Sequence, residues 1–153
     1  MRPMRRPYLT MISAVLVAVL VTVFAAVPAG AQATYQPKFK GDPARSDSEA
    51  AALGYMRTFL RAQRIYKKKY THYSTTLLDL VKTGSFTRRM AATDRGDYTV
   101  KFKSHKETDK FEITLAAKQL DASHRSFFSD EQGTIRGDEQ KEADEESPVL
   151  KAD

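Results

Sequence analysis

The chain has 153 residues, a length typical of one small domain with accessory segments. It contains no cysteine, which excludes a disulfide-stapled scaffold, thiol chemistry and thiolate metal sites. The formal net charge of +6 is unevenly distributed. Residues 138–153 hold seven acidic and two basic side chains, whereas residues 34–137 carry a large excess of lysine and arginine.

The N-terminus has the features of an export signal. Arg2, Arg5 and Arg6 precede a nearly continuous apolar stretch, 8–27, and Ala31-Gln32-Ala33 supplies the small residues that a signal peptidase requires. We therefore predict a signal peptide over 1–33, cleaved before Thr34, or after Ala31 as the alternative site. The predicted location is the periplasm or the exterior. The alternative is an uncleaved segment that anchors the chain in the inner membrane through 8–27.

A linker and a long helix follow. Residues 34–46 contain two prolines and a glycine without apolar periodicity, which indicates a linker. Ser46 and Glu49 have the spacing of a capping box. From residue 48 to about residue 70, apolar side chains recur every three or four residues, which predicts an amphipathic helix. Its predicted buried side comprises Leu53, Met56, Phe59, Leu60, Gln63, Tyr66 and Tyr70.

The second half of the chain favours antiparallel strands. Tyr98–Lys103 and Phe111–Ala117 alternate between apolar and polar residues, and an Asp130–Gly133 turn joins 125–129 to 134–136. The predicted fold class is α+β, with one long helix packed on an antiparallel sheet of about four strands. We assign this domain to 47–137 and predict that the acidic tail, 138–153, is disordered. The alternative is a tail that folds back on the basic face of the domain or binds a partner.

Three segments carry a family resemblance. The first is the helix end, with Leu53-Gly54-Tyr55, Thr58, Ala62-Gln63, Tyr66, Tyr70, Tyr73-Ser74, Leu77 and Leu80. The second is the strand pair given above. The third is Arg125-Ser126-Phe127-Phe128 with Asp130, Gly133, Ile135 and Arg136. Together these segments resemble a type IV pilin-like head, of the kind found in type II secretion pseudopilins. The resemblance covers the head alone, because the Phe-Thr-Leu-x-Glu opening of pilus-building members is missing.

The resemblance implies a non-enzymatic envelope protein that mediates protein–protein contacts in or near a secretion or pilus system. The residues themselves favour no enzyme. His72, His105 and His124 are isolated in sequence, and no nucleophile elbow accompanies Ser126, His124 and Asp130. No cofactor is predicted. Because some major pseudopilins bind calcium in a C-terminal loop, Asp130, Glu131 and Asp138 are candidate calcium ligands.

A basic helix face offers a rival hypothesis. Arg57, Arg61, Arg64 and Lys68 recur at helical spacing, with Lys67 and Lys69 beside them, and such a face suits DNA phosphates or anionic lipid head groups. A solvated helix face that faces the acidic tail explains the same residues. Phe127 and Phe128 point to opposite sides of their strand, so only one of them can enter the core, and parity does not decide which. We predict that Phe127 is buried and that Phe128 is exposed and contacts a partner, with shielding of Phe128 by the tail as the alternative.

Overall fold

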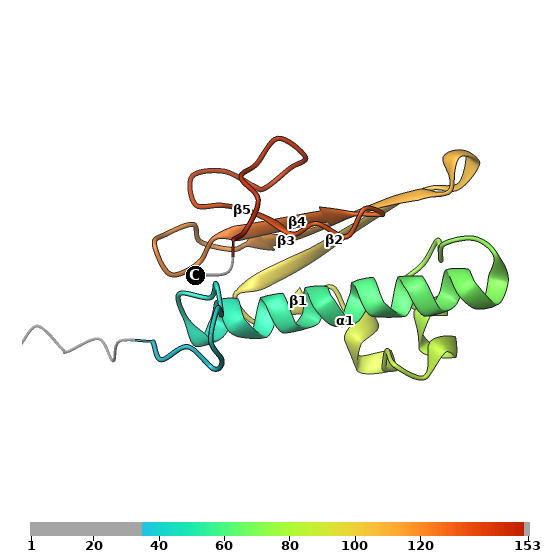
Figure 1. Ribbon diagram of the computed structural model, residues 1–153, viewed down its shortest axis with the longest axis horizontal. Coiled ribbons are helices and arrows are strands. Elements are labelled where there is room, and N and C mark those ends of the chain that lie inside the picture. The colour runs from blue at the N-terminus through green and yellow to red at the C-terminus, as the bar shows by residue number, and fades with distance from the viewer. Residues whose placement is uncertain (1–34, 152–153) are drawn as a thin grey trace, which may run out of the picture. The chain divides into compact units, whose positions relative to one another are not determined.

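The computed structural model describes residues 35–151, and the predicted signal peptide lies outside these residues. Helix α1 (Asp47–Tyr70) lies along one face of an antiparallel sheet (Figure 1). The α+β prediction is therefore confirmed, but the sheet has five strands rather than four. The strand that the sequence did not reveal is β1 (Asp94–Arg95), because two residues are too few to show an alternation.

The bounds of α1 follow from local signals. The Ser46 side chain accepts a hydrogen bond from the Glu49 N–H at 3.1 Å, as an N-cap residue does. Thr71 ends the helix in the left-handed region, with φ at 68°, and donates its N–H to the Lys67 carbonyl. A capping box would have the Glu49 carboxylate accept the N–H of Ser46, the cap residue itself. It accepts instead the N–H of Arg45, the residue before the cap.

The predicted buried side of α1 is the core side. Phe59 is fully buried, and its ring meets Phe86, Phe102 and Phe111 at tilted or edge-on angles with centroids 5.4–6.5 Å apart. Gln63 is also fully buried, and its amide exchanges two hydrogen bonds with the backbone of Ser74. This exchange fixes the chain that leaves the helix against the helix itself.

The sheet is a meander in which every strand pairs with its neighbour in sequence. Strands β2 (Tyr98–His105) and β3 (Lys110–Ala117) form the long central hairpin, with Val100 opposite Leu115. Strand β4 (Ser126–Asp130) pairs with β3, and β5 (Arg136–Asp138) pairs with β4. The short final strand thus begins two residues later than predicted, after a turn in which Gly133 has φ at 79°.

Short 3-10 helices connect α1 to the sheet and close the central hairpin. They are η1 (Asp79–Thr83), η2 (Arg88–Ala91) and η3 (Lys106–Thr108). Leu80 and Phe86 lie in the connection between α1 and β1 and are buried in the core. The connection therefore belongs to the domain rather than to an independent loop.

The disorder predicted for the acidic tail is wrong for residues 138–151. Arg136 pairs with Val149, and the Gly137 N–H donates to the Pro148 carbonyl at 3.0 Å. The tail leaves β5, runs over the face of the sheet opposite α1 and returns to the β5 edge (Figure 1). Composition alone misled because Asp138 and Asp144 accept nearby backbone N–H groups, which organises an acidic segment locally.

Part of the predicted linker also belongs to the folded unit. Asp42 and Ala44 are buried, and the Tyr35 hydroxyl donates to the Asp42 carboxylate at 2.7 Å. This hydrogen bond raises the pKa of Tyr35 to about 12 and lowers the pKa of Asp42. The domain therefore starts before residue 47.

Candidate interaction surfaces

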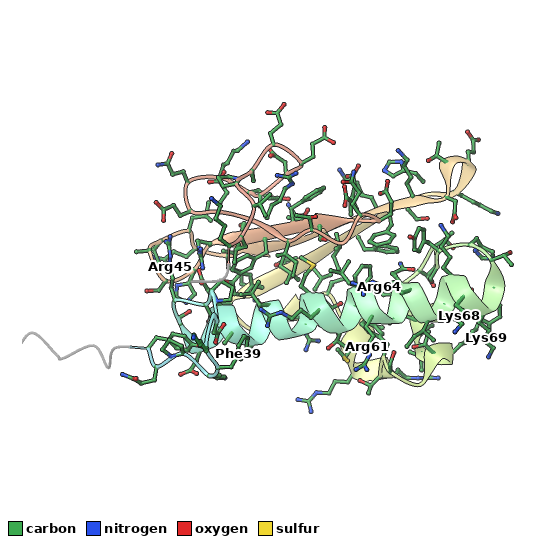
Figure 2. The ribbon with its side chains drawn as sticks, viewed as in Figure 1. Phe39, Arg45, Arg61, Arg64, Lys68 and Lys69 are labelled. Atoms are coloured by element: carbon green, nitrogen blue, oxygen red, sulfur yellow. The ribbon has the colours of Figure 1, made fainter. Side chains whose placement is uncertain are left out.

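Four cations form a basic stripe on the side of α1 that faces away from the core. They are Arg57, Arg61, Arg64 and Lys68, all exposed. Figure 2 shows Arg61, Arg64 and Lys68 following one another toward the C-terminal end of the helix. Within residues 35–151, no carboxylate lies within ion-pair distance of these four side chains. The two acidic residues of α1 both lie in its first turn, away from the stripe.

Lys67 does not share this surface, although the sequence placed it there. Its ammonium lies 3.1 Å from the Asp109 carboxylate and 4.0 Å from the centroid of the Tyr73 ring. The bond to Asp109 raises the pKa of Lys67. Two hydrogen bonds lower the pKa of Asp109: the one from the Tyr73 N–H has the larger effect and the one from Lys67 the smaller. Lys67 therefore ties α1 to the turn of the β2–β3 hairpin.

Phe39 adds an apolar group that sequence reasoning did not identify. Its ring is 51% exposed, and the guanidinium carbon of Arg57 lies 5.4 Å from the ring centroid. Figure 2 places Phe39 beside the N-terminal part of α1. Eighteen positions separate Phe39 from Arg57, so no helical spacing links them. Only the path of residues 35–46 brings them together.

The prediction of an exposed Phe128 is wrong. Phe127 is fully buried, as predicted, and stacks on Tyr98 with ring centroids 5.9 Å apart. Phe128 is also buried, at 6% exposure, on the sheet face over which the tail runs. This ring therefore offers a partner little surface.

The calcium candidates do not converge. Asp130 accepts the N–H of Gln132 in its own turn, Glu131 lies 3.7 Å from Lys110, and Asp138 accepts the N–H groups of Gln140 and Lys141. Across the described part of the chain, no group of three or more His, Asp or Glu side chains is arranged to hold a metal ion.

A buried ion pair joins three segments at the start of α1. The Glu49 carboxylate has no exposure, and it accepts hydrogen bonds from Arg125 Nε at 2.9 Å and Nη2 at 2.7 Å. Arg125 Nη2 also donates to the Pro43 carbonyl. The neighbouring Tyr98 hydroxyl is buried without a hydrogen-bond partner among the described residues, and burial raises its pKa. Sequence spacing gave no sign of this pair, because 76 positions separate its members.

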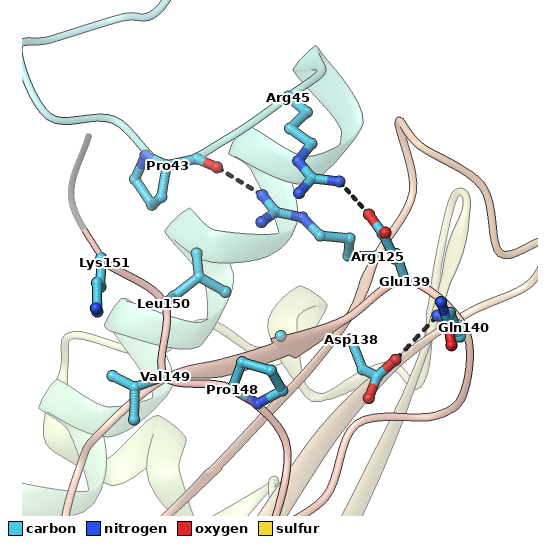
Figure 3. Close-up of a pocket in the computed structure, with 11 residues that line it drawn as sticks. Pro43, Arg45, Arg125, Asp138, Glu139, Gln140, Pro148, Val149, Leu150 and Lys151 are labelled. Carbon is cyan, nitrogen blue, oxygen red and sulfur yellow. Dashed lines mark hydrogen bonds and ion pairs between the residues drawn. The ribbon is translucent and has the colours of Figure 1, made fainter.

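A cavity of 510 Å³ lies between Arg125 of this ion pair and residues 148–151. Figure 3 shows that Arg125 bonds to Pro43, Arg45 pairs with Glu139, and Asp138 accepts a hydrogen bond from Gln140. Arg45, Arg125, Asp138 and Glu139 thus already have partners within the protein, whereas the rest of the wall combines Lys151 and Gln140 with the apolar residues Pro148, Val149 and Leu150. The geometry shows no set of polar groups aimed at a ligand.

The histidines and the residues considered for hydrolysis are bonded elsewhere. His124 contacts Asp121, whereas the Ser126 hydroxyl accepts the N–H of Ala117. His72 contacts the Tyr73 carbonyl and His105 contacts Glu112. These contacts secure turns and strands. None of them places a base against a nucleophile.

Two further findings concern the chain as a whole. Within residues 35–151, α1 does not combine the length and the apolar character needed to cross a membrane, and neither does any other helix. Comparisons with protein-family models, curated proteins and solved structures found no match to this chain.

Proposed function

We propose that this chain is an exported, non-enzymatic protein with a pilin-like head that mediates protein–protein contacts in or near a secretion or pilus system. The observation that carries the proposal is the arrangement of one long amphipathic helix against a sequential antiparallel meander. The aromatic side chains that led to the resemblance, among them Tyr66, Tyr98 and Phe127, line the contact between these two layers.

The balance between core and surface also supports a contact module. The polar side chains considered for catalysis are engaged in turns and strands, whereas several apolar side chains of the described chain remain exposed. Leu78, 56% exposed beside η1, has the largest exposed fraction among them. Exposed apolar groups on a folded domain are common at protein contact points.

Site-specific photo-crosslinking in the native host tests this proposal. A photoreactive residue at Leu78 should yield a discrete adduct with an envelope component of a secretion or pilus system, identified by mass spectrometry. The matched control places the same residue at Gln140, which is exposed on the tail. No adduct from either position, together with unchanged protein secretion and piliation after deletion of the gene, would contradict the proposal.

A further inference from the structure

The sequence left the partner of the basic helix face open between DNA and anionic lipid. We propose that the basic stripe, together with Phe39 and Ile65, binds the surface of an anionic phospholipid bilayer. The inference does not depend on the pilin-like role proposed above. It rests on four exposed cations of α1 that have no carboxylate partner among the described residues.

The stripe has the length and the shape of a surface contact. Arg57 and Lys68 are eleven residues apart on one uninterrupted helix, which separates them by about 16 Å along the axis. The four cations follow at steps of four, three and four residues, so they project from one side of a straight rod, although the Arg64 guanidinium extends toward the turn at Gly133. Such a rod meets a flat array of phosphates with all four cations at once.

Apolar side chains within the stripe favour a bilayer over nucleic acid. Ile65, 37% exposed, lies one helical turn from both Arg61 and Lys68, and Phe39 extends beside Arg57. Apolar side chains among lysines and arginines are typical of protein surfaces that rest in the head-group region, where the apolar groups enter the acyl boundary. An isoleucine contributes neither stacking nor hydrogen bonding to a nucleic acid strand.

The distribution of acidic residues orients the molecule. Glu139, Glu142, Glu145 and Glu146 are exposed in the tail, a segment that runs over the sheet face opposite α1 (Figure 1), although Glu139 itself pairs with Arg45 beside the start of α1. An anionic bilayer attracts the stripe and repels the tail, so the helix side faces the lipid. In sequence, eleven residues separate Phe39 from the apolar stretch 8–27, a reach of at most about 40 Å. Only in the alternative without cleavage would this stretch hold Phe39 within that reach of a bilayer.

Vesicle co-sedimentation of the chain that begins at Thr34 tests the proposal, because the core of residues 35–151 is complete without the apolar stretch. The vesicles contain either phosphatidylcholine alone or phosphatidylcholine mixed with phosphatidylglycerol. We expect binding to the mixed vesicles only, weakened by added salt. Replacing Arg57, Arg61, Arg64 and Lys68 with glutamine should reduce the affinity by about a hundredfold or more.

The matched control removes the same charge elsewhere. Arg88, Arg89, Lys103 and Lys106 are exposed in η2 and the β2–β3 hairpin, and their replacement with glutamine should leave most of the binding intact. Phe39→Ser with Ile65→Ser should weaken binding that persists at high salt. Circular dichroism melts confirm that each variant folds.

Three results would overturn the proposal. The first is an absence of binding to phosphatidylglycerol vesicles. The second is an equal loss in the two glutamine variants, which would reduce the effect to net charge. The third is tighter, stripe-dependent binding to short duplex DNA, which would reassign the surface to nucleic acid.

Discussion

The two faces of the sheet are covered by different means. On one face, α1 packs a continuous set of aromatic and aliphatic side chains against Val100, Ile113, Leu115 and Phe127. On the other face, the tail covers Phe128 with few apolar groups, of which Ala143 is buried, and polar contacts such as that between Arg136 and the Ser147 carbonyl fix its path. The helix face is thus held by packing and the tail face by hydrogen bonding.

This difference has an energetic consequence. Burial of apolar area contributes about 25 cal/mol per Å², whereas a hydrogen bond that replaces one to water contributes only about 0.5–1.5 kcal/mol. The helix face should therefore supply most of the stability, and the tail should open before the core unfolds.

The largest expected effect is on the helix face. Phe59→Ala should lower the free energy of unfolding by about 3–5 kcal/mol, because the fully buried ring meets three other aromatic rings. Arg61→Ala, on the exposed side of the same helix, should change it by less than about 0.5 kcal/mol. Urea unfolding of both variants measures the contrast, and similar values would mean that α1 does not dock as described.

The buried ion pair should give an effect of similar size. Glu49→Ala leaves the Arg125 guanidinium and two backbone N–H groups without their acceptor, which should cost about 3–5 kcal/mol. The control is Glu139→Ala, which removes an exposed partner of Arg45 and should cost less than about 1 kcal/mol. Chemical denaturation measures the unfolding free energy of both variants. An unchanged value for Glu49→Ala would show that the ion pair is dispensable for stability.

Phe128 gives a direct comparison of the two faces. Phe127→Ala should cost about 3–5 kcal/mol, whereas Phe128→Ala should cost roughly 1–3 kcal/mol, because the tail can settle into the space that the ring leaves. Thermal melts of the two variants test this order. Equal losses would show that the tail packs as rigidly as the helix.

Acid should open the tail with the smallest effect on global stability. The pKa of Asp138 is lowered mainly by the hydrogen bond from the Gln140 N–H, and the pKa of Asp144 is lowered mainly by the hydrogen bond from the Lys141 ammonium. Because each carboxyl has a lower pKa in the folded state than its ordinary value of 3.8, its ionised form stabilises the fold at pH values above 3.8. This stabilisation is lost as the pH falls through the folded-state pKa. The methyl resonances of Leu150 should therefore change below about pH 4, before those of Ile113.

Asp138→Asn is the informative variant for this titration. It should reduce the change that acid causes in the Leu150 resonances. Asp109→Asn, which removes the partner of Lys67 in the turn of the β2–β3 hairpin, should leave that change unaltered. Simultaneous changes of the Leu150 and Ile113 resonances in the wild-type chain would contradict separate opening of the tail.

The sequence by itself determined the elements whose periodicity extends over many residues. Helix α1 has 24 residues with an apolar side at steps of three and four, and apolar and polar residues alternate over 98–103 in β2 and over 111–115 in β3. Residue type also predicted two local features: Ser46 caps the helix, and Gly133 has a positive φ in the final turn. Such signals lie within one short segment, so no knowledge of the rest of the chain is needed to read them.

Only the tertiary structure decided which distant segments meet. The Glu49–Arg125 pair, the approach of Phe39 to Arg57 and the burial of Phe128 beneath the tail join residues far apart in sequence. Parity placed Phe127 and Phe128 on opposite sides of the strand but could not decide which ring enters the core or whether the tail covers the other. The acidic composition of that segment predicted disorder, because composition is an average over residues. The order of the segment depends instead on individual hydrogen bonds, such as those that Asp138 and Asp144 accept from nearby backbone N–H groups.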